Sequence, residues 1–118
     1  MMGLADDGGL LVPDEFPQVK SKFQEWRALS FSELSLEIML LFTSGRIPRE
    51  EFAHLVQRSY TNFRHPKITP VKSVGQIHIL ELFHGPTFAF KDVALQFLGN
   101  LFECFLAKRD HPLRIIGA

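Results

Sequence analysis

The spacing of apolar residues changes along the chain, and this change limits the fold more than any other feature of the sequence. In the first half apolar residues recur at steps of three and four, the period of a helix face, whereas Val- and Ile-rich runs typical of strands begin near Ile68. A long helical pattern then follows to Lys108. Ahead of these segments, residues 1–20 are predicted to be extended and turn-rich, with a short apolar strand or contact at residues 10–12. The order of elements predicts a mixed α/β chain.

Two amphipathic helices are predicted in the first half. The first begins near Ser30, because Ser30 and Glu33 have the S-x-x-E spacing of a capping box, and it ends at Gly45, which suits the left-handed position after a helix. The second opens at Pro48, where a missing N–H costs nothing, and residues 64–67 close it. Their apolar stripes are Phe31, Leu34, Ile38, Leu41 and Phe42 in the first, and Phe52, Leu55, Val56, Tyr60 and Phe63 in the second. Together they form a helical hairpin.

The second half predicts strands around a third helix. Residues 68–74 and 76–83 flank Gly75, which indicates a hairpin or two short strands. A helix from residue 88 or 89 to 108 has apolar positions around much of its circumference and is therefore predicted to be largely buried. Residues 113–118 begin another strand, so the order suggests a βαβ crossover and a parallel sheet. Such a sheet needs cover on both faces, which the remaining chain is too short to supply.

Composition excludes several classes of function. Thirteen basic residues balance thirteen acidic ones, which argues against a nucleic-acid or membrane-surface partner. The longest run without a charge, residues 93–102, is too short to span a membrane. The five His residues lack metal-ligand spacing, so we expect no metal site. The single Cys104 rules out a disulfide framework and reads as a small buried hydrophobe rather than a nucleophile. One Cys and no visible signal peptide predict a cytoplasmic location.

One segment, Glu81–Asp92, carries a candidate for chemistry. It passes from a strand through a Gly-Pro turn into a helix, and Lys91 falls in the first turn of that helix, where the helix dipole disfavours a cation. Phe88 and Phe90 add apolar surroundings, which also disfavour the ammonium form. A partly neutral amine can attack an aldehyde and form a Schiff base. Alternatively, Lys91 reaches water and pairs with Asp92 or a neighbour, and charge and burial alone favour this second interpretation.

Three stretches resemble one known family. The sequence E-L-F-H-G-P-T-F-A-F-K-D-V-A-L-Q-F-L-G at residues 81–99 resembles the pyridoxal-phosphate lysine motif of threonine synthases, closest to the fungal-type branch. Residues 3–13 resemble the N-terminal signature G-L-A-x-D-G-G-L-x-V-P, and the helical hairpin followed by residues 58–60 resembles the family's small N-terminal region. The resemblance implies an α/β, tryptophan synthase β-like fold of the fold-type II pyridoxal-phosphate enzymes. Residues 1–66 would be the N-terminal region and residues 67–118 the incomplete start of the cofactor-binding domain.

The resemblance also implies a reaction and assigns residues to it. Lys91 would be both the catalytic and the cofactor-binding residue, holding pyridoxal 5'-phosphate as an internal aldimine and later moving protons. The small-molecule substrate would be O-phospho-L-homoserine, and phosphate loss with water addition would give L-threonine, the last step of threonine biosynthesis. Phe90 and Asp92 would flank and position the lysine, and residues 84–87 would line the loop beside the cofactor.

The chain also departs from the family pattern, and other interpretations stay open. In the family, the substrate loop Thr-Ser-Gly-Asp-Thr-Gly and the Gly-Asn-rich phosphate loop come after the position of Ala118, and a strand region precedes Gly3. We therefore expect a truncated N-terminal fragment, about the first quarter of such an enzyme, that is inactive alone. A threonine-synthase-like phospho-lyase yielding a keto acid is one alternative. Another is a non-catalytic helical interaction fragment, or one that merely self-associates, since twelve Phe stand against one Tyr and one Trp.

Overall fold

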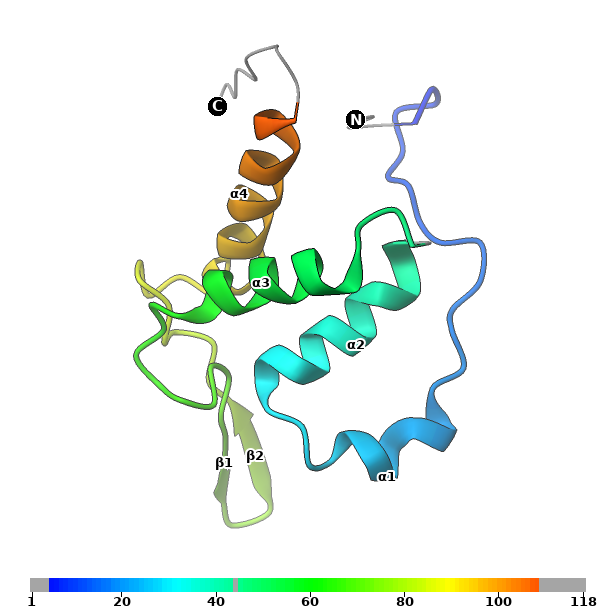
Figure 1. Ribbon diagram of the computed structural model, residues 1–118. Coiled ribbons are helices and arrows are strands. Elements are labelled where there is room, and N and C mark those ends of the chain that lie inside the picture. Colours follow the sequence, from blue (N-terminus) through cyan, green and yellow to red (C-terminus); the bar gives the residue numbers. More distant parts are fainter. Residues whose placement is uncertain (1–4, 44, 109–118) are drawn as a thin grey trace.

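The computed structural model describes residues 5–43 and 45–108. Short helices lead into three longer ones, with a two-stranded sheet between the last two (Figure 1). In chain order the elements are η1 (Lys20–Lys22), α1 (Phe23–Trp26), α2 (Phe31–Thr43), α3 (Arg49–Tyr60), β1 (Val71–Val74), β2 (Ile77–Leu80) and α4 (Asp92–Ala107). None of the described helices is both long and apolar enough to cross a membrane.

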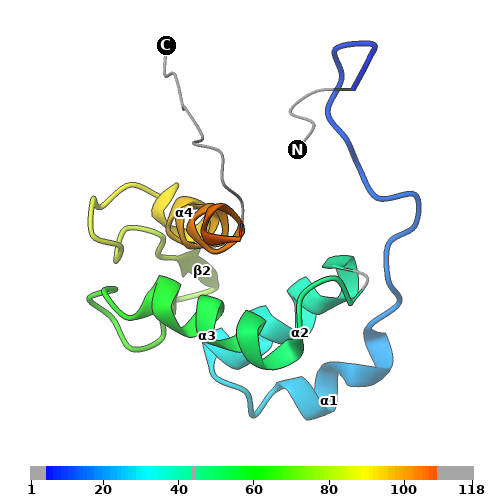
Figure 2. The same cartoon turned by 45° about the horizontal axis from the view of Figure 1, so that its top comes forward.

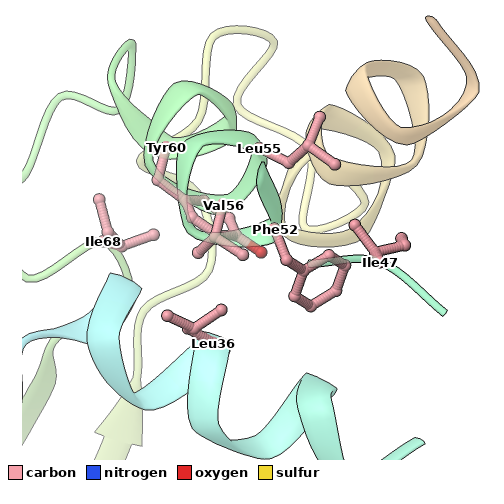
Figure 3. Close-up of a cluster of buried hydrophobic side chains, with 7 residues drawn as sticks. All are labelled: Leu36, Ile47, Phe52, Leu55, Val56, Tyr60 and Ile68. Carbon is pink, nitrogen blue, oxygen red and sulfur yellow. The ribbon is translucent and has the colours of Figure 1, made fainter. Parts of the chain in front are cut away.

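Helix α3 is the centre of the structure, because it contacts both α2 and α4 (Figures 1 and 2). Phe52 and Val56 of α3 are almost completely buried, and Leu36 of α2 points toward them (Figure 3). The hydrophobic core comprises Leu36, Ile47, Phe52, Leu55, Val56, Tyr60 and Ile68. From α4, Phe97 and Leu101 pack against this cluster. The predicted helical hairpin is therefore confirmed and forms the core of the chain. The predicted apolar stripe of its first helix is wrong in part, because Leu36 is the buried residue of α2 whereas Ile38 and Phe42 are 41% and 51% exposed.

The helix boundaries follow largely from local signals. The Ser30 N–H donates to Glu33 Oε2 at 2.7 Å and the Glu33 N–H donates to Ser30 Oγ at 3.3 Å, so the predicted capping box is confirmed. Gly45 follows α2 with a φ of 69°, the left-handed conformation expected of it. Pro48 precedes α3 as its N-cap instead of being its first helical residue, and its carbonyl accepts the N–H of Phe52 at 3.0 Å.

The predicted β-hairpin is also confirmed. Strands β1 and β2 pair antiparallel, with Val71 opposite Leu80 and Val74 opposite Ile77. Gly75 has a φ of 62° at the first central position of the two-residue turn, as a type II′ turn requires. Every residue of both strands is exposed, because this sheet has no covering layer among the described residues.

Two expectations about the third helix are wrong. Helix α4 begins at Asp92, not at residue 88 or 89, because Phe88 has a φ of 64°, which no right-handed helix contains. Its predicted burial is also incomplete. Phe97 and Leu101 pack against the core, whereas Leu95 is 52% exposed and lies on a face that no described element covers.

The N-terminal region differs from prediction at two places. Residues 10–12 form no strand and are well exposed, because no described strand lies beside them. The short helices η1 and α1 were not predicted, and Trp26 of α1 is buried. The predicted strand at residues 113–118, which would complete the βαβ unit, lies outside the described residues.

Candidate functional site

The loop from Glu81 to Lys91, the lysine loop, connects β2 to α4, and its first end is fixed to the base of the hairpin. The Glu81 N–H donates to the Pro70 carbonyl at 3.0 Å. The buried Glu81 carboxylate lies 2.7 Å from His84 Nε2 and 3.3 Å from Lys72 Nζ. The hydrogen bond with His84, and to a lesser extent the one with Lys72, lowers the pKa of Glu81 below its ordinary value. This carboxylate therefore anchors the start of the loop as an anion.

Asp92 fixes the other end of the loop. Its carboxylate is buried and accepts two hydrogen bonds from Thr87, one from the backbone N–H at 2.8 Å and one from the hydroxyl at 2.9 Å. Gly85 leaves room for this carboxylate, since a Cβ at position 85 would lie 2.7 Å from Asp92 Cγ and would overlap its Cβ and Oδ2. The Gly85 backbone and the first residue of α4 are therefore in close contact.

Arg64, in the turn after α3, supports the loop from the helical core. Its backbone N–H donates to the His84 carbonyl at 2.8 Å, and its guanidinium donates to the carbonyls of Gly85 at 2.8 Å and Pro86 at 3.4 Å. The guanidinium also lies over the Phe88 ring, 3.9 Å from its centroid. A cation–π contact at an exposed site contributes about 0.5–1 kcal/mol, which offsets part of the ~1–3 kcal/mol cost of the strained Phe88 backbone.

Lys91 lies at the junction of this loop and α4. It is the N-cap residue of α4, not a residue of its first turn, and its carbonyl accepts the N–H of Leu95 at 2.8 Å. The predicted apolar surroundings are wrong, because Lys91 is exposed and Phe90 beside it is 64% exposed. Within residues 5–43 and 45–108 the Lys91 ammonium has no ion pair, and Asp92 bonds to Thr87 instead. The amine is therefore accessible.

The structure brings the other predicted loop residues together. His84, Gly85, Pro86 and Thr87 follow one another in the loop before Lys91. The ring of His84 contacts that of His65, with centroids 4.9 Å apart and ring planes tilted by 42°. Arg64 is not among the predicted site residues, because the sequence pattern places it only at the end of a helix. Periodicity carries no signal for it, because its partners lie about twenty residues further along the chain.

Cys104 lies away from this loop, on the side of α4 that faces α3. Its thiol donates a hydrogen bond to Glu51 Oε1 at 3.0 Å, and Lys108 bonds to the same oxygen. The hydrogen bond to Glu51 raises the pKa of the Cys104 thiol, which favours its protonated form. The predicted structural role of this half-buried residue agrees with that environment.

Comparison with known sequences points to one family. The family model described as "Threonine synthase N terminus" matches residues 1–60. The chain is 52% identical to the threonine synthase of Schizosaccharomyces pombe, in an alignment covering 100% of this chain and 25% of that protein. It is 50% identical to the threonine synthase of Saccharomyces cerevisiae, over 96% of this chain and 24% of that protein. The chain thus spans about a quarter of the length of these curated relatives.

Solved structures agree with this assignment and confirm the predicted fold class. A threonine synthase from Brucella melitensis with PLP bound superposes with a TM-score of 0.84 at 42% identity, covering 90% of this chain and 23% of that one. A yeast threonine synthase superposes with a TM-score of 0.81 at 50% identity, covering 89% and 22%. Both solved structures are threonine synthases, and the one from Brucella melitensis binds PLP. The chain belongs to the threonine synthase family.

Proposed function

We propose that this chain supplies the lysine side of the active site of a threonine synthase, which converts O-phospho-L-homoserine and water into L-threonine and phosphate. The observation that carries the proposal is the placement of Lys91. Its amine is accessible and without an ion pair among the described residues, at the end of a loop that Glu81, Arg64 and Asp92 hold in place. The similarity to threonine synthases supports the substrate and a cytoplasmic location. Because the chain spans about a quarter of these relatives, the reaction is proposed for the assembled enzyme.

The residues of the lysine loop fit pyridoxal phosphate as the cofactor. A primary amine that is not engaged in an ion pair is the group that reacts with the cofactor's aldehyde, and Lys91 provides it. Lys91 would therefore hold the cofactor covalently through Nζ, and the same amine, once released by substrate, would carry protons. The bound cofactor supplies an electron sink for carbanion chemistry. Residues 84–87 would border the cofactor, and residues 67–118 would begin the domain that holds it, after an N-terminal region of residues 1–66.

The main alternative is a phospho-lyase that releases a keto acid instead of threonine. Proteins named threonine synthase-like 2 also match this chain, and the human one is 33% identical over 117 residues. The fungal threonine synthases are 48–52% identical. This difference favours threonine as the product.

The proposal can be tested in a chimera in which this chain replaces the aligned quarter of the S. pombe threonine synthase. We expect the chimera, given O-phospho-L-homoserine, to release phosphate and L-threonine in equal amounts. Lys91→Ala should lower the rate by about a hundredfold or more, because the chimera loses both the covalent anchor and the proton carrier. Lys22→Ala is the matched control, since this exposed lysine lies over Trp26, outside the lysine loop.

Each product pattern has a distinct meaning. A Lys91→Ala chimera that still forms threonine at the normal rate would refute the assignment of Lys91. Formation of a keto acid with little threonine would show that the alternative reaction is correct.

A further inference from the structure

We infer that Arg64 is a positioning residue for Lys91: it holds the loop before the lysine in the strained conformation that places Lys91 at the start of α4. This inference rests on the proposed function, since it concerns the same lysine. Arg64 lies outside the lysine motif and reaches the loop from the turn after α3, about twenty residues earlier in the sequence.

The contacts of Arg64 are with three consecutive carbonyls. Its backbone N–H bonds to the carbonyl of His84, and its guanidinium bonds to those of Gly85 and Pro86. A planar guanidinium can donate to two carbonyls and stack on an aromatic ring at the same time, which the single ammonium of a lysine cannot do. The geometry at this position therefore specifies arginine and not merely a positive charge.

The ring that Arg64 covers belongs to the strained residue of the loop. Phe88 has a φ of 64°, a conformation that a bulky side chain rarely adopts, and it lies three residues before Lys91. Asp92 restrains the residues on either side of Phe88: its carboxylate accepts two hydrogen bonds from Thr87, and its N–H donates to the Ala89 carbonyl at 3.0 Å. Among these contacts, only that of Arg64 is with the Phe88 ring itself. Without the guanidinium on its ring, Phe88 can relax to negative φ, and the backbone leading to Lys91 changes direction.

Helix α3, which precedes Arg64, is fixed in the core and to α4. Val56, about one turn before the end of α3, is 1% exposed in the core. At the end of α3, the Tyr60 hydroxyl donates to the Val93 carbonyl in the first turn of α4 at 3.1 Å. Arg64 and Lys91 therefore extend from two elements that are fixed to each other, so that Arg64 can transmit the position of α3 to the lysine.

Amide hydrogen exchange tests the effect on the loop without any cofactor. In the 118-residue chain, we expect the amides of Thr87 and Phe88 to exchange about tenfold faster or more in Arg64→Ala, because hydrogen bonds from a charged donor are lost. Arg64→Lys should show nearly the same loss. Arg58→Ala, which removes an exposed ion pair of α3 with Glu103, should leave these amides unchanged. Unchanged protection in Arg64→Ala would overturn the inference.

Trapping of the cofactor tests the effect on the lysine. In the same chimera, pyridoxal phosphate and borohydride should label Lys91, and the visible circular dichroism of the bound cofactor should report its orientation. We expect Arg64→Ala to slow labelling of Lys91 about tenfold and to change the circular dichroism. Added guanidinium should restore both, which it would not do if Arg64 served only global stability.

The two proposals fail in different ways. If the unmodified chimera is not labelled at Lys91, the proposed function is wrong, whatever Arg64 does to the loop. If it is labelled, but Arg64→Ala gives the same rate and the same circular dichroism, Arg64 has no positioning role and the proposed function stands.

Discussion

The helical core and the region formed by the hairpin and the outer face of α4 are both rich in apolar residues, yet they differ sharply in burial. In the core, Phe52 and Val56 are 2% and 1% exposed. In the hairpin, Val74 and Ile77 are 63% and 66% exposed, and Leu95 on the outer face of α4 is 52% exposed. The two regions differ in their neighbours: α3 packs between two helices, whereas the hairpin makes no extensive contact with any of the described helices.

Different kinds of interaction stabilise the fold and the candidate site. Apolar burial stabilises the α2–α3–α4 contacts, whereas the lysine loop is held by polar and charged contacts of Arg64, Glu81 and Asp92. Substitutions in the core should therefore change global stability most. Those in the loop should change local geometry at Lys91 with smaller effects on stability.

The largest effect is expected for Phe52→Ala. This substitution leaves a cavity in the core and removes the edge-to-face contact with Phe97, whose ring centroid lies 5.6 Å away. We expect the free energy of unfolding to fall by about 3–5 kcal/mol, measured by urea denaturation followed by circular dichroism. Should this loss leave too little folded protein to measure, Phe52→Leu should show a smaller loss in the same direction.

Ile77→Ala in the hairpin is the contrasting variant. Ile77 is 66% exposed, so its truncation should change the free energy of unfolding by less than about 0.5 kcal/mol. Equal losses for Ile77→Ala and Phe52→Ala would contradict the difference between the two regions.

Substitution of two glycines by alanine should change the stability of the chain by intermediate amounts and in opposite directions. Gly85→Ala should destabilise the chain by about 1–3 kcal/mol, because its Cβ would overlap the buried Asp92 side chain. Gly99→Ala in α4 meets no atom within 4 Å and should stabilise the chain by about 0.5–1 kcal/mol. Thermal unfolding of both variants measures the two changes in stability. If Gly85→Ala were neutral, the close contact between loop and helix would not constrain the site.

Sequence patterns predicted the elements whose determinants are local. The capping box of Ser30 and Glu33, the turn at Gly45 and the hairpin at Gly75 each depend on residues within a few positions, and all three are confirmed. The predicted burial of α4 was too extensive, because apolar periodicity identifies the apolar face of a helix but not whether another element packs against it. The start of α4 was placed too early, since nothing in the sequence signals the left-handed backbone of Phe88.

The candidate site was likewise predicted only where its determinants are local in sequence. Lys91 and residues 84–87 belong to one continuous segment that sequence analysis could single out. Arg64 could not be assigned to the loop, because its contacts join the end of α3 to a segment beyond the hairpin. The exposure of Lys91 likewise depends on tertiary structure.

The smallest effect concerns the pH dependence of the loop anchor. Hydrogen bonding with His84, then with Lys72, lowers the pKa of Glu81 in the folded chain. The stabilisation from this carboxylate is therefore fully present above the ordinary glutamate pKa of about 4.3, and it is lost as the pH falls through the lower pKa of the folded state. Glu81→Gln, which cannot ionise, should be less stable than the unmodified chain at about pH 6.

Comparison of the two chains across the acid range isolates this contribution. Urea denaturation should show the stability difference between them shrinking below about pH 4.3, because protonated Glu81 loses its attraction for Lys72 and His84. The core is common to both chains, so its own acid response cancels in the difference. A difference that stays constant or grows on acidification would mean that the Glu81 anion does not anchor the loop. The lysine loop would then depend on Arg64 and Asp92 for its position.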